Sequence, residues 1–151
     1  MLHELMQDEK LRDILKNHAK SLIEYLLEKN EPFGVLAKTD QIDFNPDIPI
    51  EVKNSFGEFA LFLLINYTLE SAYIKEEDLV FEAGFGSENI GSIVTVPIES
   101  ILQIVVDKTP IFVNITATTI WQKKEKNGIK NSMEALLSNP ENQKFLKKRK
   151  K

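Results

Sequence analysis

Residues that could do chemistry are few and widely separated in this chain of 151 residues. There is no cysteine, which excludes disulfides, thiolate nucleophiles and cysteine-ligated metal sites. The only histidines are His3, near the amino terminus, and His18, on a predicted helix among residues that face a core. We therefore expect neither a metal site nor a cofactor.

The glycines at Gly84, Gly86 and Gly91 suggest a phosphate-binding loop at first sight. Their spacing fits neither G-x-G-x-x-G nor the P-loop, and the residues that follow are typical of a strand rather than a helix. We interpret this segment as a hairpin turn, so it predicts no nucleotide site.

The acidic residues also fail to form a recognisable catalytic or calcium-binding motif. Asp40, Asp43 and Asp47 are too widely spaced for a calcium loop and lack its central glycine. Glu76-Glu77-Asp78 falls on a predicted turn, where we expect the carboxylates to stay solvated. No serine stands in a G-x-S-x-G elbow. We expect no catalytic residues, and a binding role rather than an enzyme.

Charge divides the chain into two parts that the net value of −4 conceals. Residues 1–122 carry nine basic and twenty acidic residues, whereas residues 123–151 carry ten basic and three acidic ones. We predict one acidic domain over residues 1–122 and a basic carboxy-terminal tail over residues 123–151. An acidic body disfavours nucleic-acid binding, which depends on Lys and Arg at the phosphates. Only the tail could bind nucleic acid.

The apolar segments of the chain bear on its localisation, because none is long enough for a secretory signal or a membrane-spanning helix. The amino terminus lacks the basic and continuous apolar regions of a secretory signal. The longest nearly unbroken apolar run, Phe59–Ile65, is seven residues long, whereas a membrane-spanning helix needs about 20. We interpret this run as a buried strand, and we expect a cytoplasmic protein with no membrane partner.

The hydrophobic pattern changes period after the first fifth of the chain. Apolar residues at helical spacing predict a helix over Leu11–Glu28, which Asn30-Glu31-Pro32 would end. Pro97–Gln103 fits a short helical turn. Short segments rich in β-branched and aromatic residues predict strands at Phe33–Lys38, Ile48–Val52, Glu58–Tyr67, Ala72–Lys75, Leu79–Phe85, Ser92–Val96 and Ile111–Trp121. Closely spaced strands with short turns favour an antiparallel sheet or barrel.

Four stretches, in this order and spacing, resemble the stringent starvation protein B (SspB) family of bacterial adaptors, which deliver tagged proteins to the ClpXP protease. They are Ile23–Asn30, Val35–Thr39, Leu79–Gly86 and Val94–Ile101. The most specific parts are the aromatic-glycine hairpin at Phe81–Gly86 and the Val-Pro step at Val96 and Pro97.

The resemblance implies a mainly β (α+β) fold, in which an N-terminal helix packs on an Sm-like antiparallel β-barrel. It also implies a homodimer, with a groove that binds an extended ssrA-like degradation tag. The positions that correspond to the family's groove are Tyr67, Thr68, Ala83, Gly84 and Phe85. From the residues alone, Phe81 and Phe85 share one face of a strand and fit a plain core as well as a groove.

Two further regions take a role from the resemblance. The family uses the first helix for dimer contacts, which here involve Leu22, Tyr25 and Leu26. A short basic and apolar segment at the carboxy terminus docks on the ClpX unfoldase in the family. Its counterpart here is Lys144, Phe145, Leu146 and Lys147. A tethered tail would raise the local concentration of cargo at the unfoldase.

The chain departs from the family at the hairpin, where an arginine is replaced by Gly84 and a glycine by Ser87. Loss of that arginine removes a charged donor near the groove, and the acidic body favours a neutral or basic tag. The sequence therefore predicts a non-enzymatic ClpXP adaptor with its own tag preference. The alternatives are an Sm-like nucleic-acid-binding module that acts through the tail and a small enzyme with solvated carboxylates.

Overall fold

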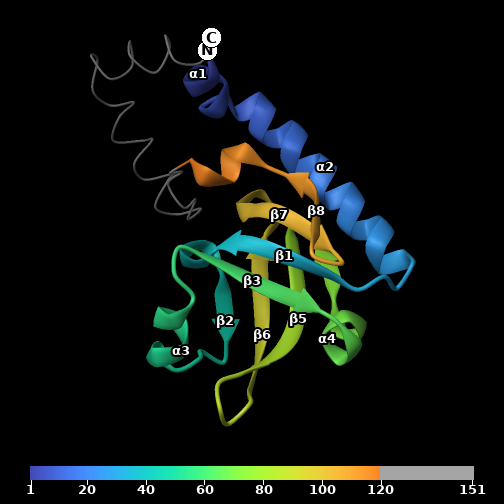
Figure 1. Ribbon diagram of the computed structural model, residues 1–151, viewed down its shortest axis with the longest axis vertical. Helices are drawn as coiled ribbons and strands as arrows, with labels where there is room; N and C mark the ends of the chain where they lie inside the picture. The colour runs from blue at the N-terminus through green and yellow to red at the C-terminus, as the bar shows by residue number, and fades with distance from the viewer. Residues whose placement is uncertain (120–151) are drawn as a thin grey trace, which may run out of the picture. The chain divides into compact units, whose positions relative to one another are not determined.

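The computed structural model describes residues 1–119 of the chain (Figure 1). Two helices open it, α1 (Leu2–Met6) and α2 (Glu9–Glu28). Asp8 caps α2, since its side chain accepts a 2.8 Å hydrogen bond from the backbone N–H of Lys10. The predicted N-terminal helix is therefore confirmed, and α2 ends at the predicted place before Pro32. Within residues 1–119, no helix is long and apolar enough to cross a membrane.

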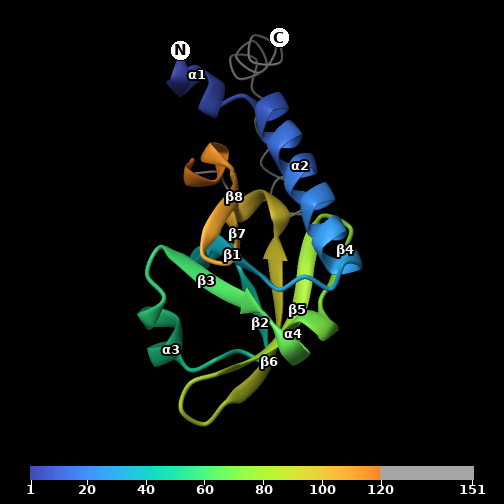
Figure 2. The same cartoon turned by 45° about the vertical axis from the view of Figure 1, so that its right-hand side comes forward.

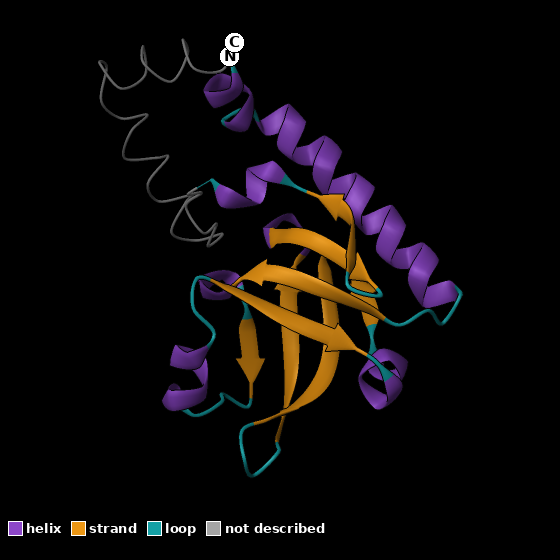
Figure 3. Cartoon of the chain, viewed as in Figure 1, coloured by secondary structure: helices purple, strands orange, loops and turns teal. Residues whose placement is uncertain are grey.

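The strands form two antiparallel sheets of four strands each (Figure 3). The first sheet contains, in spatial order, β3 (Phe59–Leu64), β1 (Phe33–Lys38), β7 (Ile101–Val106) and β8 (Thr109–Val113). The second contains β2 (Asp43–Asn45), β6 (Ile90–Pro97), β5 (Asp78–Phe85) and β4 (Tyr73–Lys75). The α+β class with antiparallel pairing is thus as predicted.

Short helical segments join the strands. Two are α-helical and three are 3₁₀ turns: α3 (Ile50–Ser55), α4 (Asn66–Ser71), η1 (Thr39–Gln41), η2 (Ile98–Ser100) and η3 (Ile115–Thr118). In Figures 1 and 2, α4 lies beside β5, and α2 runs along the end of the molecule that carries β7 and β8.

Four predicted elements are corrected by the structure. The strand predicted at Ile111–Trp121 stops at Val113, where β8 ends, and η3 follows it. The strand predicted at Ile48–Val52 is the helix α3, because Val52 and Phe56 are four residues apart and both pack against the core from a helical face. The strand predicted to end at Tyr67 stops at Leu64, and α4 follows it. The helical turn predicted over Pro97–Gln103 is only η2, after which the chain continues as β7.

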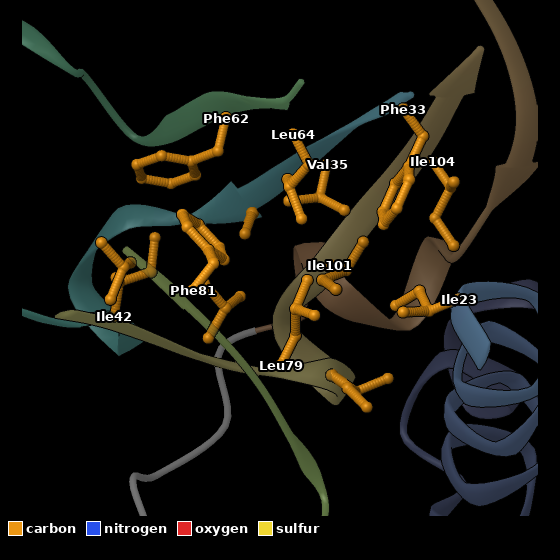
Figure 4. Packing of buried hydrophobic residues seen from close by; sticks show 14 of the residues in the cluster. Ile23, Phe33, Val35, Ile42, Phe62, Leu64, Leu79, Phe81, Ile101 and Ile104 are labelled. Atoms are coloured by element: carbon orange, nitrogen blue, oxygen red, sulfur yellow. The ribbon is translucent and has the colours of Figure 1, made fainter. Parts of the chain in front are cut away.

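The two sheets enclose one hydrophobic core but do not close into a barrel. β1 bridges β3 and β7 in the first sheet, and β6 bridges β2 and β5 in the second. Figure 4 shows Phe62 of β3 and Phe81 of β5 on facing walls of this core. Among the described strands, β3 and β5 are not paired with each other, and α4 follows β3 directly and packs on β5.

Helix α2 is fixed to the sheets by apolar contacts and ion pairs. Ala19, Ile23 and Leu26 are buried in the core, and the ring of His18 meets that of Phe112 edge-on at 5.0 Å between centroids. Arg12 forms an ion pair with Glu99 of η2. His18 is therefore an exposed residue whose ring contacts Phe112.

Glu77, at the turn between β4 and β5, contributes further ion pairs to the helix. It lies 3.6 Å from both Lys16 and Lys20 of α2. Asp78, the next residue, is partly buried. The expectation that the acidic turn is solvated is wrong for Asp78, whereas Glu77 is exposed as expected.

Candidate functional site

An opening between the two sheets lies where two strand edges face each other. β3 pairs with β1 along one side over its whole length, from Phe59 to Leu64. Its other edge has no strand partner among the described residues. Backbone N–H and C=O groups on such an edge can pair with an additional strand.

The facing edge belongs to the second half of β5. β4 covers only the start of β5, where Tyr73, Ile74 and Lys75 pair with Val80, Leu79 and Asp78. Beyond this, the N–H of Glu82 donates a 2.9 Å hydrogen bond to the Ser71 hydroxyl of α4. Because alternate residues of a strand point their backbone groups to the same edge, those of Gly84 also face away from β6. The edge at Gly84 is therefore open.

Two hollows of about 420 Å³ and about 290 Å³ lie along this opening. Thr68, Ala83 and Gly84 line both of them, so the two hollows adjoin along β5, the smaller one beside β3 and the larger one beside β2 and β6, and we treat the pair as one groove. We call it the β3–β5 groove. Its dimensions are within the range of ligand-binding clefts in proteins.

The floor of the groove is aromatic. Phe81 is fully buried, and its ring centroid lies 5.6 Å from that of Phe62 on β3. Phe85, only partly buried, lies 6.3 Å from Phe62 and 5.5 Å from Phe44. Phe85 thus belongs to both the core and the groove surface, the two alternatives that the sequence left open.

The side of the groove formed by β3 is apolar and exposed. We call its two exposed leucines, Leu61 and Leu63, the leucine lip. Leu61 and Leu63 are 53% and 59% exposed, whereas the alternating Ala60, Phe62 and Leu64 are buried. The prediction that this apolar run is a buried strand is therefore wrong for one of its two faces. Exposed leucines beside an open strand edge are typical of a surface that binds another chain.

The opposite side of the groove is formed by the hairpin and by β2 and β6. Asn89, in the left-handed region at φ 50°, carries its side chain against the outer face of Gly84. A Cβ atom at Gly84 would lie 1.9 Å from Asn89 Oδ1, so only glycine allows this approach. Ser92 Oγ donates a 2.8 Å hydrogen bond to the carbonyl of Pro46, which ties the loop after β2 to β6.

The electrostatics of the groove are dominated by Glu82. Its carboxylate lies within hydrogen-bonding reach of the Tyr67 hydroxyl and raises the pKa of Tyr67, with a smaller contribution from the charge of Glu70. Tyr67 itself is 61% exposed. This end of the groove therefore combines an aromatic surface with negative charge.

The structure brings all five predicted groove residues together. Ala83, Gly84 and Phe85 lie on β5 as predicted, whereas Tyr67 and Thr68 lie on α4 rather than on a strand. Sequence reasoning missed Leu61, Leu63, Glu82 and Asn89. Because every residue around Leu61 and Leu63 is apolar, the sequence cannot show that these two side chains point outward. The charged Glu82 between Phe81 and Ala83, by contrast, does indicate an outward face.

The predicted dimer residues differ in their exposure. Leu26 is buried in the core of its own chain, Leu22 is partly buried, and Tyr25 is 54% exposed. The predicted docking segment, Lys144 to Lys147, and the whole predicted tail at residues 123–151 lie outside the described residues.

Other parts of the described chain offer less to a ligand. A hollow of about 440 Å³ lies between η1 and α3, where the N–H of Thr39 already donates a 2.9 Å bond to the carbonyl of Glu58. Among residues 1–119, no three His, Asp or Glu side chains are grouped so that they could hold a metal ion.

Comparison with models of known protein families finds no match for this chain. A search of curated proteins also finds no similar sequence. The resemblance to SspB therefore depends on the ordered stretches of the sequence and stays a prediction.

Proposed function

We propose that this chain is a non-enzymatic adaptor of the SspB type, which holds the extended end of a tagged polypeptide in the β3–β5 groove. Its tail would dock on ClpX and deliver the cargo to the ClpXP protease in the cytoplasm. The two sheets would then be an Sm-like barrel opened between β3 and β5. The chain would act as a homodimer through α2, with Tyr25 exposed for the contact.

The observation that carries the proposal is the pair of open strand edges that border the groove. An extended peptide can add to the edge of a sheet, where main-chain hydrogen bonds provide affinity and side-chain pockets provide selectivity. The β3 edge is open along its length, and the β5 edge is open at Gly84. Both border the same groove, in which Thr68 lines both hollows.

The aromatic floor and the leucine lip support the same function. Phe62 and Phe85 present ring surface beneath the open edges, and Leu61 and Leu63 present apolar side chains beside them. Such a surface would bind the small and apolar side chains of a tag by burial. It requires no assembled catalytic group.

A direct test is fluorescence anisotropy with a labelled ssrA-type peptide and the full-length chain. We expect saturable binding with a Kd at or below tens of micromolar, and no binding to a scrambled peptide. Thr68→Arg places a long side chain at the residue shared by both hollows and should weaken binding at least about tenfold. Thr109→Arg makes the same change at an exposed residue of β8, outside the groove, and should have no effect.

Two outcomes would contradict the proposal. One is the absence of saturable binding to any ribosomal-rescue tag. The other is equal loss of binding in Thr68→Arg and Thr109→Arg, because this would place the interaction outside the groove.

Delivery is tested separately, with ClpXP and a tagged fluorescent reporter. The full chain should lower the KM for the reporter, whereas a chain without residues 141–151 should bind the tag but no longer lower the KM. If the shortened chain still lowers the KM, the tail has no role in delivery.

The basic tail supports a second candidate, an Sm-like nucleic-acid-binding module. The ten basic residues among residues 123–151 would attract the phosphates of RNA. This function predicts RNA binding that weakens steeply with added salt and disappears when residues 141–151 are removed. Binding of a tag peptide in the groove without RNA binding would exclude it.

A further inference from the structure

The side chains around the groove contain only one kind of charge. Of the described residues that line its two hollows, Glu82 is the only charged one, and none is a lysine or arginine. Glu70, on α4, adds a second negative charge near Tyr67. An acidic side chain in the groove would therefore meet repulsion and find no cationic partner among these residues.

The backbone fixes how an incoming strand would meet Glu82. The Glu82 N–H already bonds to Ser71, so the position at which β5 can accept a new strand is Gly84, two residues further along. Glu82 and Gly84 point to the same, outer face of β5, on which both are exposed. A peptide paired at Gly84 therefore lies close to Glu82, which is two residues away on the same face of β5.

The surroundings of Glu82 suit a long basic side chain. Side chains that face each other on neighbouring strands interact, and opposite charges are favourable there, whereas like charges are not. The exposed ring of Tyr67 lies next to the Glu82 carboxylate and can contact the aliphatic stem or the charged group of a lysine or arginine. One carboxylate and one aromatic ring thus form a small cation-accepting end to the groove.

We infer that the β3–β5 groove selects extended peptides with a lysine or arginine at the position beside Glu82 and Tyr67, and disfavours peptides with an acidic residue there. The inference rests on the proposed peptide-binding function and adds the chemistry of the ligand to it.

The test uses three labelled peptides that differ at a single position, which carries alanine, lysine or glutamate. Several such sets of three peptides are made from the same uncharged, alanine-rich sequence, and each set varies a different position. In one of these sets the varied position lies beside Glu82. Binding to the full chain is measured by anisotropy at about 0.15 M salt, where the Debye length is about 8 Å and distant charges of the body are screened. We expect the lysine peptide to bind at least about fivefold more tightly than the glutamate peptide in one set.

Two matched variants test whether Glu82 causes the preference for the lysine peptide over the glutamate peptide. Glu82→Gln keeps the size of the side chain and removes its charge, and should reduce the lysine-to-glutamate ratio to below about twofold. Glu24→Gln removes the same charge from an exposed site on α2, away from the groove, and should leave the ratio unchanged. The alanine peptide should bind the native chain and Glu24→Gln equally.

The outcomes distinguish a failure of this inference from a failure of the proposed peptide-binding function. If none of the three peptides binds, and ssrA-type tags do not bind either, the proposed function fails. If the alanine peptide binds but no set shows a preference for lysine, only the inference fails. A preference that persists in Glu82→Gln, or is lost in Glu24→Gln, overturns the assignment to Glu82.

Discussion

The N–H of Glu82 on β5 donates a hydrogen bond of 2.9 Å to the hydroxyl of Ser71, the last residue of α4. The same hydroxyl donates a 2.8 Å bond to the carbonyl of Thr68 within the helix. One side chain therefore ends α4 and also attaches it to the strand that borders the groove. This attachment determines where Tyr67 and Thr68 lie relative to β5.

Ser71→Ala should loosen this attachment. Both hydrogen bonds are lost, and because the Glu82 N–H is accessible to water, we expect a loss of only about 1 kcal/mol in the free energy of unfolding. Peptide affinity should fall by more than stability alone explains, since α4 forms one end of the groove. Urea unfolding and anisotropy measure the two effects.

Ser55→Ala is the matched control. Ser55 also ends a short helix and bonds to the carbonyl three residues back, with Ser55 Oγ 2.6 Å from the Val52 oxygen, but within residues 1–119 it has no bond to a strand. Its removal should cost less stability and leave peptide affinity unchanged. Equal effects of the two substitutions would show that the bond to Glu82 is unimportant.

Gly84→Ala should close part of the groove with little loss of stability. The new methyl group would overlap Asn89 Oδ1, and the side chain of Asn89 can move away because its amide is the flexible end of the contact. We expect peptide affinity to fall about tenfold and the free energy of unfolding to change by less than about 1 kcal/mol.

The double variant Gly84→Ala, Asn89→Gly tests the mechanism. Glycine accepts the positive φ of 50° at position 89 without strain and removes the side chain that the methyl group would displace. Affinity should recover at least in part relative to Gly84→Ala. A double variant no better than the single one would mean that the methyl group itself blocks the peptide.

Phe85→Leu should weaken peptide binding more than it weakens the fold. The smaller side chain loses ring contacts with Phe44, Phe56 and Phe62, for which we expect a cost of about 1–2 kcal/mol in stability. It also removes aromatic floor from the groove, so affinity should fall about fivefold or more.

Phe56→Leu provides the comparison. Phe56 belongs to the same ring cluster, with centroids 5.9 Å from Phe62 and 6.1 Å from Phe85, but it does not line the groove. We expect a similar loss of stability and no loss of peptide affinity. If both variants lose affinity equally, the effect comes from the core and not from the floor.

The parts of the fold that the sequence predicted well are those with a long, regular pattern. Helix α2 has a stripe of apolar residues at helical spacing, and β1 matches the predicted Phe33–Lys38 at both ends. The β5–β6 hairpin follows from alternating residues around the turn at Gly86. In each case local pattern and tertiary burial agree.

Short segments were predicted poorly because their pattern fits more than one structure. Six residues such as those of α3 or α4 cannot separate a strand from two turns of helix by period alone. Strand β7 was missed because Pro97 indicates a helix start, whereas the structure ends the helical segment at Ser100 and adds a strand.

The groove residues show the same limit. Five positions follow from the family resemblance, but the leucine lip and Glu82 depend on which strand edge is left open. The open edges arise because α4 lies beside β5 where β3 would otherwise pair, which is a tertiary arrangement. No local sequence pattern encodes it.

Asp78 provides a prediction about the pH dependence of stability. Its partial burial, together with the nearby charges of Glu76, Glu77 and Glu99, raises the pKa of its carboxyl above the ordinary value of 3.8. A carboxyl whose pKa is higher in the folded protein than in the unfolded chain binds protons more readily when folded. Ionised Asp78 therefore destabilises the fold at neutral pH, and this cost is relieved as the pH falls through the folded pKa.

Asp78→Asn removes the ionised carboxylate and should raise Tm at pH 7 by about 1–3 °C, a small effect because the group is only partly buried and water screens its charge. The gain should disappear below about pH 4, where the native carboxyl is protonated in both states. Thermal unfolding of both proteins from pH 3 to pH 8 measures it. Asp40→Asn, at an exposed residue of η1, controls for the change in net charge. An equal gain in the two variants would assign the effect to the net charge of the acidic body, and a loss of stability in Asp78→Asn would show that its carboxylate is a favourable partner in the fold.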